Sequence, residues 1–183
     1  MNGLAAAVGI PGQQAADMLA GLTRRELTIA TAESLTGGLL AALLTEIPGS
    51  SAVVRGGLVV YATDLKHQLA GVDEQLLAER GPVDPLVATE LADGARRVCG
   101  ADIGVGLTGV AGPDPQHGID VGTWFCAVSG PGGHRDQRSG APADLAQPDS
   151  GTDLARISTR GLIRSAAVRA ALEMLTNIDE MDS

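Results

Sequence analysis

The stretch LTIATAESLTGGLLAALL, residues 27–44, decides the fold of this chain. Its first four residues are apolar or β-branched and predict a short buried strand, whereas its last six favour a helix. The hydroxyl of Ser34 therefore lies where a strand ends and a helix begins. Gly37 and Gly38 let the backbone approach a ligand, and unpaired amides at a helix start favour an anion or a developing negative charge.

This turn supports two interpretations. A serine at such a position, with a lysine available from another element, indicates nucleophilic chemistry on a carbonyl group. Serine or threonine followed by glycine is also ordinary sequence for a helix cap, and most such turns do no chemistry. The choice between them depends on the rest of the chain.

The composition predicts one acidic domain. The chain has 183 residues and a formal net charge of −9, with no basic run. We expect a single domain over residues 1–183, with a core of alanine, valine, leucine and isoleucine, because only 2% of the residues are aromatic. The acidic balance argues against nucleic acid and membranes as partners, and no segment is long and apolar enough to span a bilayer.

The cysteines and the N-terminal sequence predict a cytoplasmic protein. Cys99 and Cys126 are too isolated for a disulfide framework and are typical of small apolar core residues. The first ten residues lack a basic region, and the Pro-Gly pair at 11–12 ends the apolar run early, which argues against a signal peptide. A homo-oligomer is compatible with this Ala-rich composition, but no residue specifies a symmetry.

Strands that alternate with helices predict an α/β fold, a three-layer α/β/α domain with a mixed central sheet. Helices are expected at 13–27, 39–46, 85–98 and 158–175, with a short helix capped by Thr63 or Asp64. Strands are expected at 27–30, within 53–61, at 103–107 and at 121–128. The polar segment 129–153 is expected to be a mobile surface excursion. The buried side of helix 85–98 is expected to hold Leu86, Ala88, Leu91, Ala92 and Ala95.

Lys66 and Tyr61 are the side chains from other elements that can join Ser34. Lys66 either extends into solvent, as most lysines do, or lies beside Ser34, where burial lowers its pKa and keeps some amine neutral. Tyr61 is the only tyrosine, and it either packs in the core or hydrogen-bonds to the serine–lysine pair. His67 is a weak candidate for a Ser-His-Asp triad, and we do not favour it.

The loop TGVAGP at 108–113 follows a buried strand, where ligand loops of α/β folds commonly lie. Its glycines permit close approach, although a plain turn has the same composition. It lacks the Gly-Lys-Ser/Thr end of a phosphate-binding P-loop and the spacing of a dinucleotide fingerprint. The three histidines and two cysteines show no metal-ligand spacing, so we expect no metal and no other cofactor.

Several segments, taken in order, resemble the CinA C-terminal domain family of nicotinamide mononucleotide amidohydrolases. They are TAESLTGG at 31–38, GGLVVY at 56–61 followed by Lys66 and GV at 71–72, GPV at 81–83, the loop at 108–113 and VGT at 121–123. They cover most of the chain from about residue 19 to 128, and the last helix also fits. Several motifs in one order are far more specific than any one of them.

The resemblance implies a metal-independent hydrolase. Its small-molecule substrate would be nicotinamide mononucleotide, from which it removes ammonia to give nicotinic acid mononucleotide for cofactor recycling. In the family the serine of the first motif is the nucleophile and the lysine is its base. Those roles transfer to Ser34 and Lys66, with Tyr61 as an assisting hydrogen-bond partner. Larger members carry an additional N-terminal domain that this chain is expected to lack.

The chain departs from the family pattern in two places. Leu35 stands where many members have cysteine, beside the nucleophile. Before the last helix, STR at 158–160 replaces the family's Gly-Asp-Arg, so Arg160 matches the arginine and the aspartate is missing. The final strand is expected near 134–138 or near 154–157.

The expected mechanism follows from these roles. Neutral Lys66 takes the proton of Ser34, whose oxygen attacks the carboxamide carbon, and Lys66 then protonates the departing ammonia. Backbone amides of the turn at 34–38 hold the oxyanion, and the loop after residue 107 holds the ribose and phosphate. The expected substrate-binding residues are Thr36, Gly37, Gly38, Thr108, Gly109 and Gly112. Two alternatives stay open: a regulatory domain that binds a nucleotide without hydrolysis, and an amidase for another small carboxamide.

Overall fold

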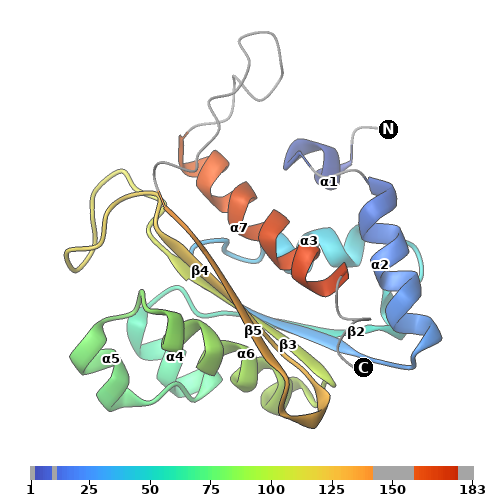
Figure 1. The fold of residues 1–183 in the computed structure, drawn as a ribbon, viewed down its shortest axis with the longest axis horizontal. Helices are drawn as coiled ribbons and strands as arrows, with labels where there is room; N and C mark the ends of the chain where they lie inside the picture. Colours follow the sequence, from blue (N-terminus) through green and yellow to red (C-terminus); the bar gives the residue numbers. More distant parts are fainter. Residues whose placement is uncertain (1–2, 10–11, 142–158, 177–183) are drawn as a thin grey trace, which may run out of the picture.

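A five-stranded mixed sheet forms the centre of the molecule (Figure 1). The structure, a computed structural model, describes residues 3–9, 12–141 and 159–176. The strand order is β2-β1-β3-β4-β5, in which β1 pairs in parallel with β2 and β3, whereas β4 and β5 are antiparallel to their neighbours. The strands are β1 (Ile29–Glu33), β2 (Val54–Val59), β3 (Ile103–Gly109), β4 (Trp124–Ser129) and β5 (Arg135–Gly140).

Helices cover both faces of this sheet, which confirms the predicted three-layer α/β fold (Figure 1). One face carries α1 (Leu4–Ala7), α2 (Gly12–Arg24), α3 (Leu39–Glu46) and α7 (Thr159–Thr176). The other carries α4 (Thr63–Ala70), α5 (Glu74–Arg80) and α6 (Pro85–Cys99). Two short 3₁₀ turns lie at Ser50–Ala52 and Pro131–Gly133. None of the helices in the described ranges combines the length and apolarity needed to cross a membrane.

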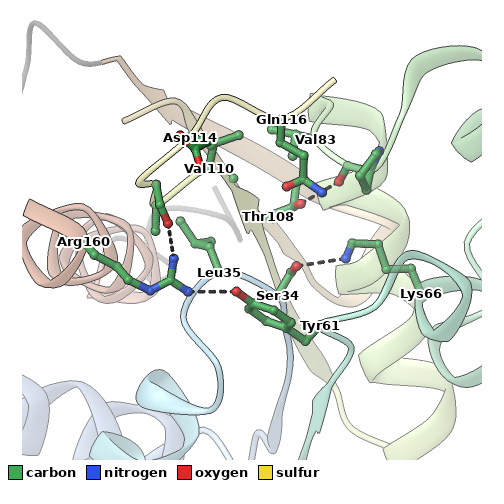
Figure 2. A pocket seen from close by; sticks show the side chains of 14 residues that line it. Ser34, Leu35, Tyr61, Lys66, Val83, Thr108, Val110, Asp114, Gln116 and Arg160 are labelled. Atoms are coloured by element: carbon green, nitrogen blue, oxygen red, sulfur yellow. Dashed lines mark hydrogen bonds between the residues drawn. The ribbon is translucent and has the colours of Figure 1, made fainter. Parts of the chain in front are cut away.

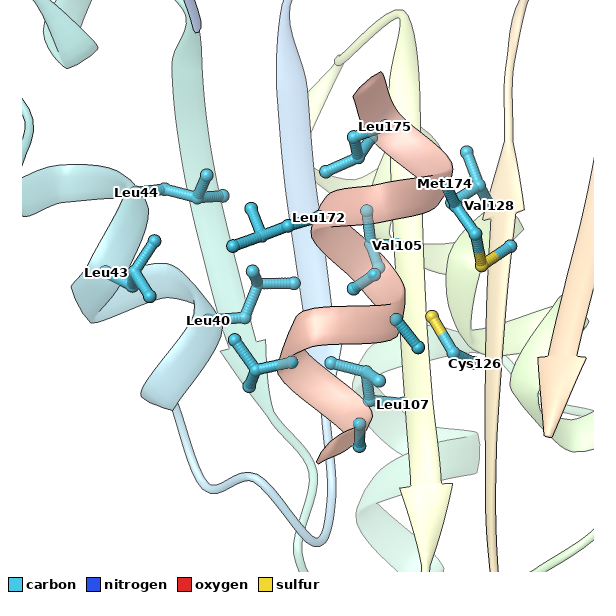
Figure 3. Packing of buried hydrophobic residues seen from close by; sticks show 14 of the residues in the cluster. Leu40, Leu43, Leu44, Val105, Leu107, Cys126, Val128, Leu172, Met174 and Leu175 are labelled. Atoms are coloured by element: carbon cyan, nitrogen blue, oxygen red, sulfur yellow. The ribbon is translucent and has the colours of Figure 1, made fainter. Parts of the chain in front are cut away.

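The larger core lies between the sheet and α7. Leucine side chains of α3 pack against Leu172 of α7, while Met174 lies against Cys126 and Val128 of β4 (Figure 3). These side chains are aliphatic or sulfur-containing, as the scarcity of aromatic residues predicts. Trp124 is the one aromatic residue among the buried members of this cluster. The core thus holds α7 firmly across β3 and β4, with its first residues directed toward one edge of the sheet.

Local sequence signals placed several elements correctly. Helix α3 and helix α6 begin and end close to the predicted positions, and Asp84 caps α6 by accepting from the Leu86 amide at 2.8 Å. The short helix α4 is also present, but its N-cap is Ala62, so Thr63 and Asp64 lie in its first turn and do not cap it. Helix α5 was not expected from the sequence.

Two predictions in this region are wrong. Residues 135–140 are not part of a mobile excursion, because they form the edge strand β5, paired along its whole length with β4. The strand was therefore correctly placed by the alternative near 134–138, and the other alternative at 154–157 lies outside the described residues. Leu86 is exposed on α6 rather than buried, because it lies in the first turn of the helix, two residues after the Asp84 cap, and faces away from the sheet.

Helix α6 lies unusually close to β3. A Cβ atom added at Gly106 would overlap the carbonyl oxygen of Ala88 and lie 2.6 Å from the Ala92 amide nitrogen. Both groups belong to helix backbone that cannot turn aside, so the glycine is required for this contact.

We predict that Gly106→Ala destabilises the protein by roughly 1–3 kcal/mol, because α6 must move away from the sheet. Gly21→Ala is the matched control, since Gly21 lies in α2 and its nearest neighbour is the flexible end of Arg24 at 3.7 Å. That change should stabilise the helix by about 0.5–1 kcal/mol. Denaturant unfolding measures both, and equal stability of the two variants would contradict the packing argument.

Candidate active site

Ser34 is the first residue after β1, at the edge where the three parallel strands end. Its amide donates to the carbonyl of Leu107 on β3 at 2.9 Å. On the other side, the Glu33 carbonyl accepts from the Val60 amide at 2.9 Å. Both neighbouring strands therefore hold the backbone that carries Ser34. Ligand sites of α/β folds commonly lie at this carboxyl edge of the sheet.

Lys66 reaches Ser34 from the other side of the sheet edge (Figure 2). Its Nζ lies 2.9 Å from Ser34 Oγ and 2.9 Å from the Val60 carbonyl oxygen, and the side chain is only 1% exposed. Of the two placements considered for Lys66, the structure has the buried one. Burial lowers the pKa of Lys66 from 10.5 to about 8, because the cation loses its water. An appreciable fraction of the amine is therefore neutral near neutral pH.

The turn after Ser34 is closed by its own backbone. The Gly37 amide donates to the Ser34 carbonyl at 3.1 Å, and the Leu39 amide donates to the Thr36 carbonyl at 3.2 Å. Gly37 and Gly38 have φ of 60° and 88°, backbone angles that residues with a side chain rarely adopt. The two glycines are thus needed for the turn itself.

Glu33 caps the helix that follows this turn. Its carboxylate is completely buried and accepts from the amides of Leu40 at 3.1 Å and Ala41 at 2.8 Å, in the first turn of α3. The Thr31 hydroxyl adds a third hydrogen bond at 3.1 Å. Gly38 occupies the N-cap position and has no side chain for this task, so the preceding strand supplies the carboxylate.

A pocket opens over the Ser34–Lys66 pair (Figure 2). It encloses about 580 Å³ of empty space, part of it open to solvent. Its walls come from the end of β1, the loops after β2 and β3, the segment before α6, and the start of α7. Among the described residues, its cationic side chains are Lys66 and Arg160, and its acidic side chain is Asp114.

Arg160 joins two of these walls. Its guanidinium donates to the Gly112 carbonyl at 2.6 Å and to the Tyr61 hydroxyl at 2.8 Å. Tyr61 is 60% exposed and lines the pocket, so it does not pack in the core. In this structure its hydroxyl contacts Arg160, and no hydrogen bond in the described part of the chain joins it to Ser34 or Lys66. An assisting role for Tyr61 stays a prediction.

The remaining predicted binding residues fall into two groups. Gly109 and Gly112 line the pocket, and Thr108 also borders it, but the buried hydroxyl of Thr108 donates to the Pro82 carbonyl at 2.6 Å. Thr36, Gly37 and Gly38 form the turn beneath the pocket and do not line it. Direct contact of these residues with a substrate therefore stays a prediction.

Three residues that contribute to the site were not predicted from the sequence. Glu33 carried one signal, a charged residue at the end of an apolar strand, and it proves to be the cap of α3. Asp114 and Gln116 border the pocket from the loop after β3, where nothing in the local sequence distinguished them from surface residues. No three histidine, cysteine, aspartate or glutamate side chains within the described ranges gather in a way that could hold a metal ion.

Comparison with protein families gives one match that covers most of the chain. A family model described as the CinA C-terminal domain matches residues 12–178, in agreement with the resemblance seen in the motifs. A CinA-like protein of Frankia casuarinae is 43% identical over 154 residues, which are 84% of this chain and 32% of that protein. A CinA-like protein of Gemmatimonas aurantiaca is 44% identical over 133 residues, 71% of this chain and 31% of that protein. The chain thus spans about a third of the length of these relatives.

Solved structures share the whole fold. The competence/damage inducible protein CihA of Agrobacterium tumefaciens superposes with a TM-score of 0.80 at 35% identity, covering 92% of this chain and 94% of that one. A CinA superfamily protein of Escherichia coli gives a TM-score of 0.78 at 26% identity, covering 91% of this chain and 89% of that one. The overall fold described above is therefore common to these proteins.

We predict that the reactivity of Ser34 follows the titration of Lys66. A fluorophosphonate bonds covalently to an activated serine hydroxyl, and only the neutral amine can accept the serine proton. With a pKa of about 8 for Lys66, the labelling rate should rise about tenfold per pH unit up to that value and then level off.

Two variants test this profile. Lys66→Met should abolish labelling, whereas His67→Gln should leave the pH profile in place, because the His67 ring contacts the Val72 carbonyl at 2.8 Å and not Ser34. A rate that is flat between pH 6 and 8, or a midpoint that moves in the His67 variant, would refute Lys66 as the base.

Proposed function

Because the chain belongs to the CinA C-terminal domain family, we propose that it hydrolyses the carboxamide of nicotinamide mononucleotide to nicotinic acid mononucleotide and ammonia. The observation that carries the proposal is the buried pair in which Lys66 Nζ lies 2.9 Å from Ser34 Oγ. A lysine has little reason to be buried against a serine hydroxyl unless its neutral form is used. A pure binding module would not need this pair.

The reaction proceeds in two halves on Ser34. Neutral Lys66 accepts the hydroxyl proton as Ser34 Oγ attacks the carboxamide carbon, and the carbonyl oxygen becomes an oxyanion. The intermediate collapses, the carbon–nitrogen bond breaks, and Lys66 gives its proton to the leaving ammonia. Water then attacks the acyl-enzyme, with Lys66 again taking a proton, and the carboxylic acid leaves as Ser34 recovers its hydrogen.

Backbone amides beside the nucleophile stabilise the oxyanion. The Ser34 amide is already bonded to Leu107, and the Gly37 amide to Ser34, so neither is free for this task. The Leu35 amide has no acceptor among the described residues, and Leu35 lines the pocket. Loss of one such donor typically costs about 2.7–4 kcal/mol of transition-state stabilisation.

Arg160 is our candidate for the substrate phosphate. It borders the pocket with Lys66, and Lys66 is buried at the reacting end, which leaves Arg160 as the cation for the other end. Guanidinium groups suit phosphate because they offer several donors in one plane. Asp114 also lines the pocket and carries the charge that suits a pyridinium ring.

We predict that purified protein releases ammonia from nicotinamide mononucleotide with a chelator present, and that Ser34→Ala abolishes this release without unfolding the protein. The mutant keeps the Val60 carbonyl as an acceptor for Lys66, so it should stay folded with only a modest loss of thermal stability. Retained turnover in clean Ser34→Ala protein would rule out the serine mechanism. Binding of the nucleotide without ammonia release in the wild type would favour a regulatory binding domain.

A second comparison tests the role of Arg160. Arg160→Ala should raise KM for the mononucleotide by about 10- to 100-fold, the value of a charge-assisted hydrogen bond, and change KM for the riboside little. Arg138→Ala is the control, because Arg138 pairs with Glu173 on the surface at 2.8 Å, away from this pocket. Equal losses for the two substrates would contradict phosphate binding. Faster turnover of free nicotinamide than of the mononucleotide or the riboside would indicate an amidase for another carboxamide.

A further inference from the structure

A second arginine of α7, Arg164, contacts the turn that carries the nucleophile. Its Nη2 donates to the Thr36 carbonyl at 2.6 Å, across 128 residues of sequence. Its Nε is buried without a partner, and no carboxylate in the described part of the chain lies within ion-pair distance of it. A partly buried guanidinium that donates to one carbonyl and has no counter-ion loses hydration free energy that little else recovers, so its presence here needs an explanation.

The carbonyl that it contacts begins a series of peptide groups. The peptide that joins Thr36 to Gly37 accepts from Arg164 at its oxygen and donates from its nitrogen to the Ser34 carbonyl at 3.1 Å. The peptide that joins Ser34 to Leu35 is the next in line. The only cis peptide in the described ranges is Gly112–Pro113, so both of these are trans, and in each the N–H points opposite to the C=O.

The series ends at the Leu35 amide. Because the Ser34 carbonyl faces into the turn toward Gly37, the Leu35 N–H faces out of it, and Leu35 borders the pocket beside Arg160 and Ser34 (Figure 2). Hydrogen bonds in series polarise one another. A positive charge at the first carbonyl therefore makes the last N–H a stronger donor and fixes its direction.

We propose that Arg164 is a positioning residue, which orients and polarises the Leu35 amide so that this amide binds the oxyanion formed on attack by Ser34. This inference rests on the proposed function for its reaction, but it concerns any attack of Ser34 on an electrophile that develops negative charge on oxygen. Arg164 touches neither the substrate nor the reacting atoms.

The competing explanation is that Arg164 merely fastens α7 to the turn. Arg169 provides the matched control for such an anchor. It lies on the same helix, is also partly buried, and donates to the carbonyl of a distant segment, Val8, at 3.0 Å. Arg169 does not line the pocket. Replacing Arg169 therefore removes a helix anchor of the same kind and leaves the series of peptide groups unchanged.

The test compares Arg164→Gln, Arg164→Lys and Arg169→Gln in the full chain. Arg164→Gln should lower kcat about 10- to 100-fold with KM within twofold, and should slow fluorophosphonate labelling of Ser34 by a similar factor. The pH midpoint of labelling should not move, since Lys66 is untouched. Arg164→Lys, which keeps a charged donor, should recover part of the loss, and Arg169→Gln should keep wild-type rates while losing comparable thermal stability.

The outcomes separate this inference from the proposed function. If the wild type does not hydrolyse the mononucleotide but Arg164→Gln still slows labelling of Ser34, the proposed substrate is wrong and the role of Arg164 stands. If hydrolysis is observed and Arg164→Gln changes only stability or KM, or acts no more strongly than Arg169→Gln, the role of Arg164 is overturned. It is also overturned if wild-type Ser34 neither hydrolyses the mononucleotide nor reacts with the fluorophosphonate, because no oxyanion site then exists.

Discussion

Burial of the Lys66 amine beside Ser34 is the constraint on which the rest of the site depends. The drop in its pKa from 10.5 to about 8 corresponds to about 3 kcal/mol against the charged form. The fold offsets part of this cost with two acceptors, the Ser34 hydroxyl and the Val60 carbonyl. Ser34 and Val60 follow directly on β1 and β2, so the parallel register of the two strands sets the spacing of the two acceptors that Lys66 reaches from α4.

The last helix joins the loops around this pair. Arg160 contacts the segment after β2 through Tyr61 and the loop after β3 through Gly112, and Arg164 contacts the turn after β1. Helix α7 is fixed in turn by its aliphatic packing against α3, β3 and β4 (Figure 3). The geometry of three loops that are far apart in the sequence therefore depends on how α7 packs on the sheet.

The parts of the fold that the sequence predicts are those with local signals. The strand, turn and helix around Ser34 could be predicted because β-branched residues, paired glycines and a leucine-rich run act over short distances. Strand β5 could be placed only as one of two alternatives, since its residues are polar and mostly exposed and its stability comes from pairing with β4 along one edge. Leu86 was misplaced because helical spacing alone does not say which residues of the first turn face the sheet.

The site shows the same division between local and long-range information. Family motifs name Ser34 and Lys66, but only the folded sheet brings them within 2.9 Å. Glu33 accepts from main-chain amides in the first turn of α3, and Arg164 donates to the Thr36 carbonyl in the turn before that helix. The one local sign of these contacts is a charged residue at the end of an apolar strand. The position of the nucleophile thus depends on main-chain hydrogen bonds to both neighbouring strands and on two charged side chains that bind main-chain groups beside it. Aliphatic packing supplies the stability of the domain, and these polar contacts supply the precision of its turn, so the two properties are separable by mutation.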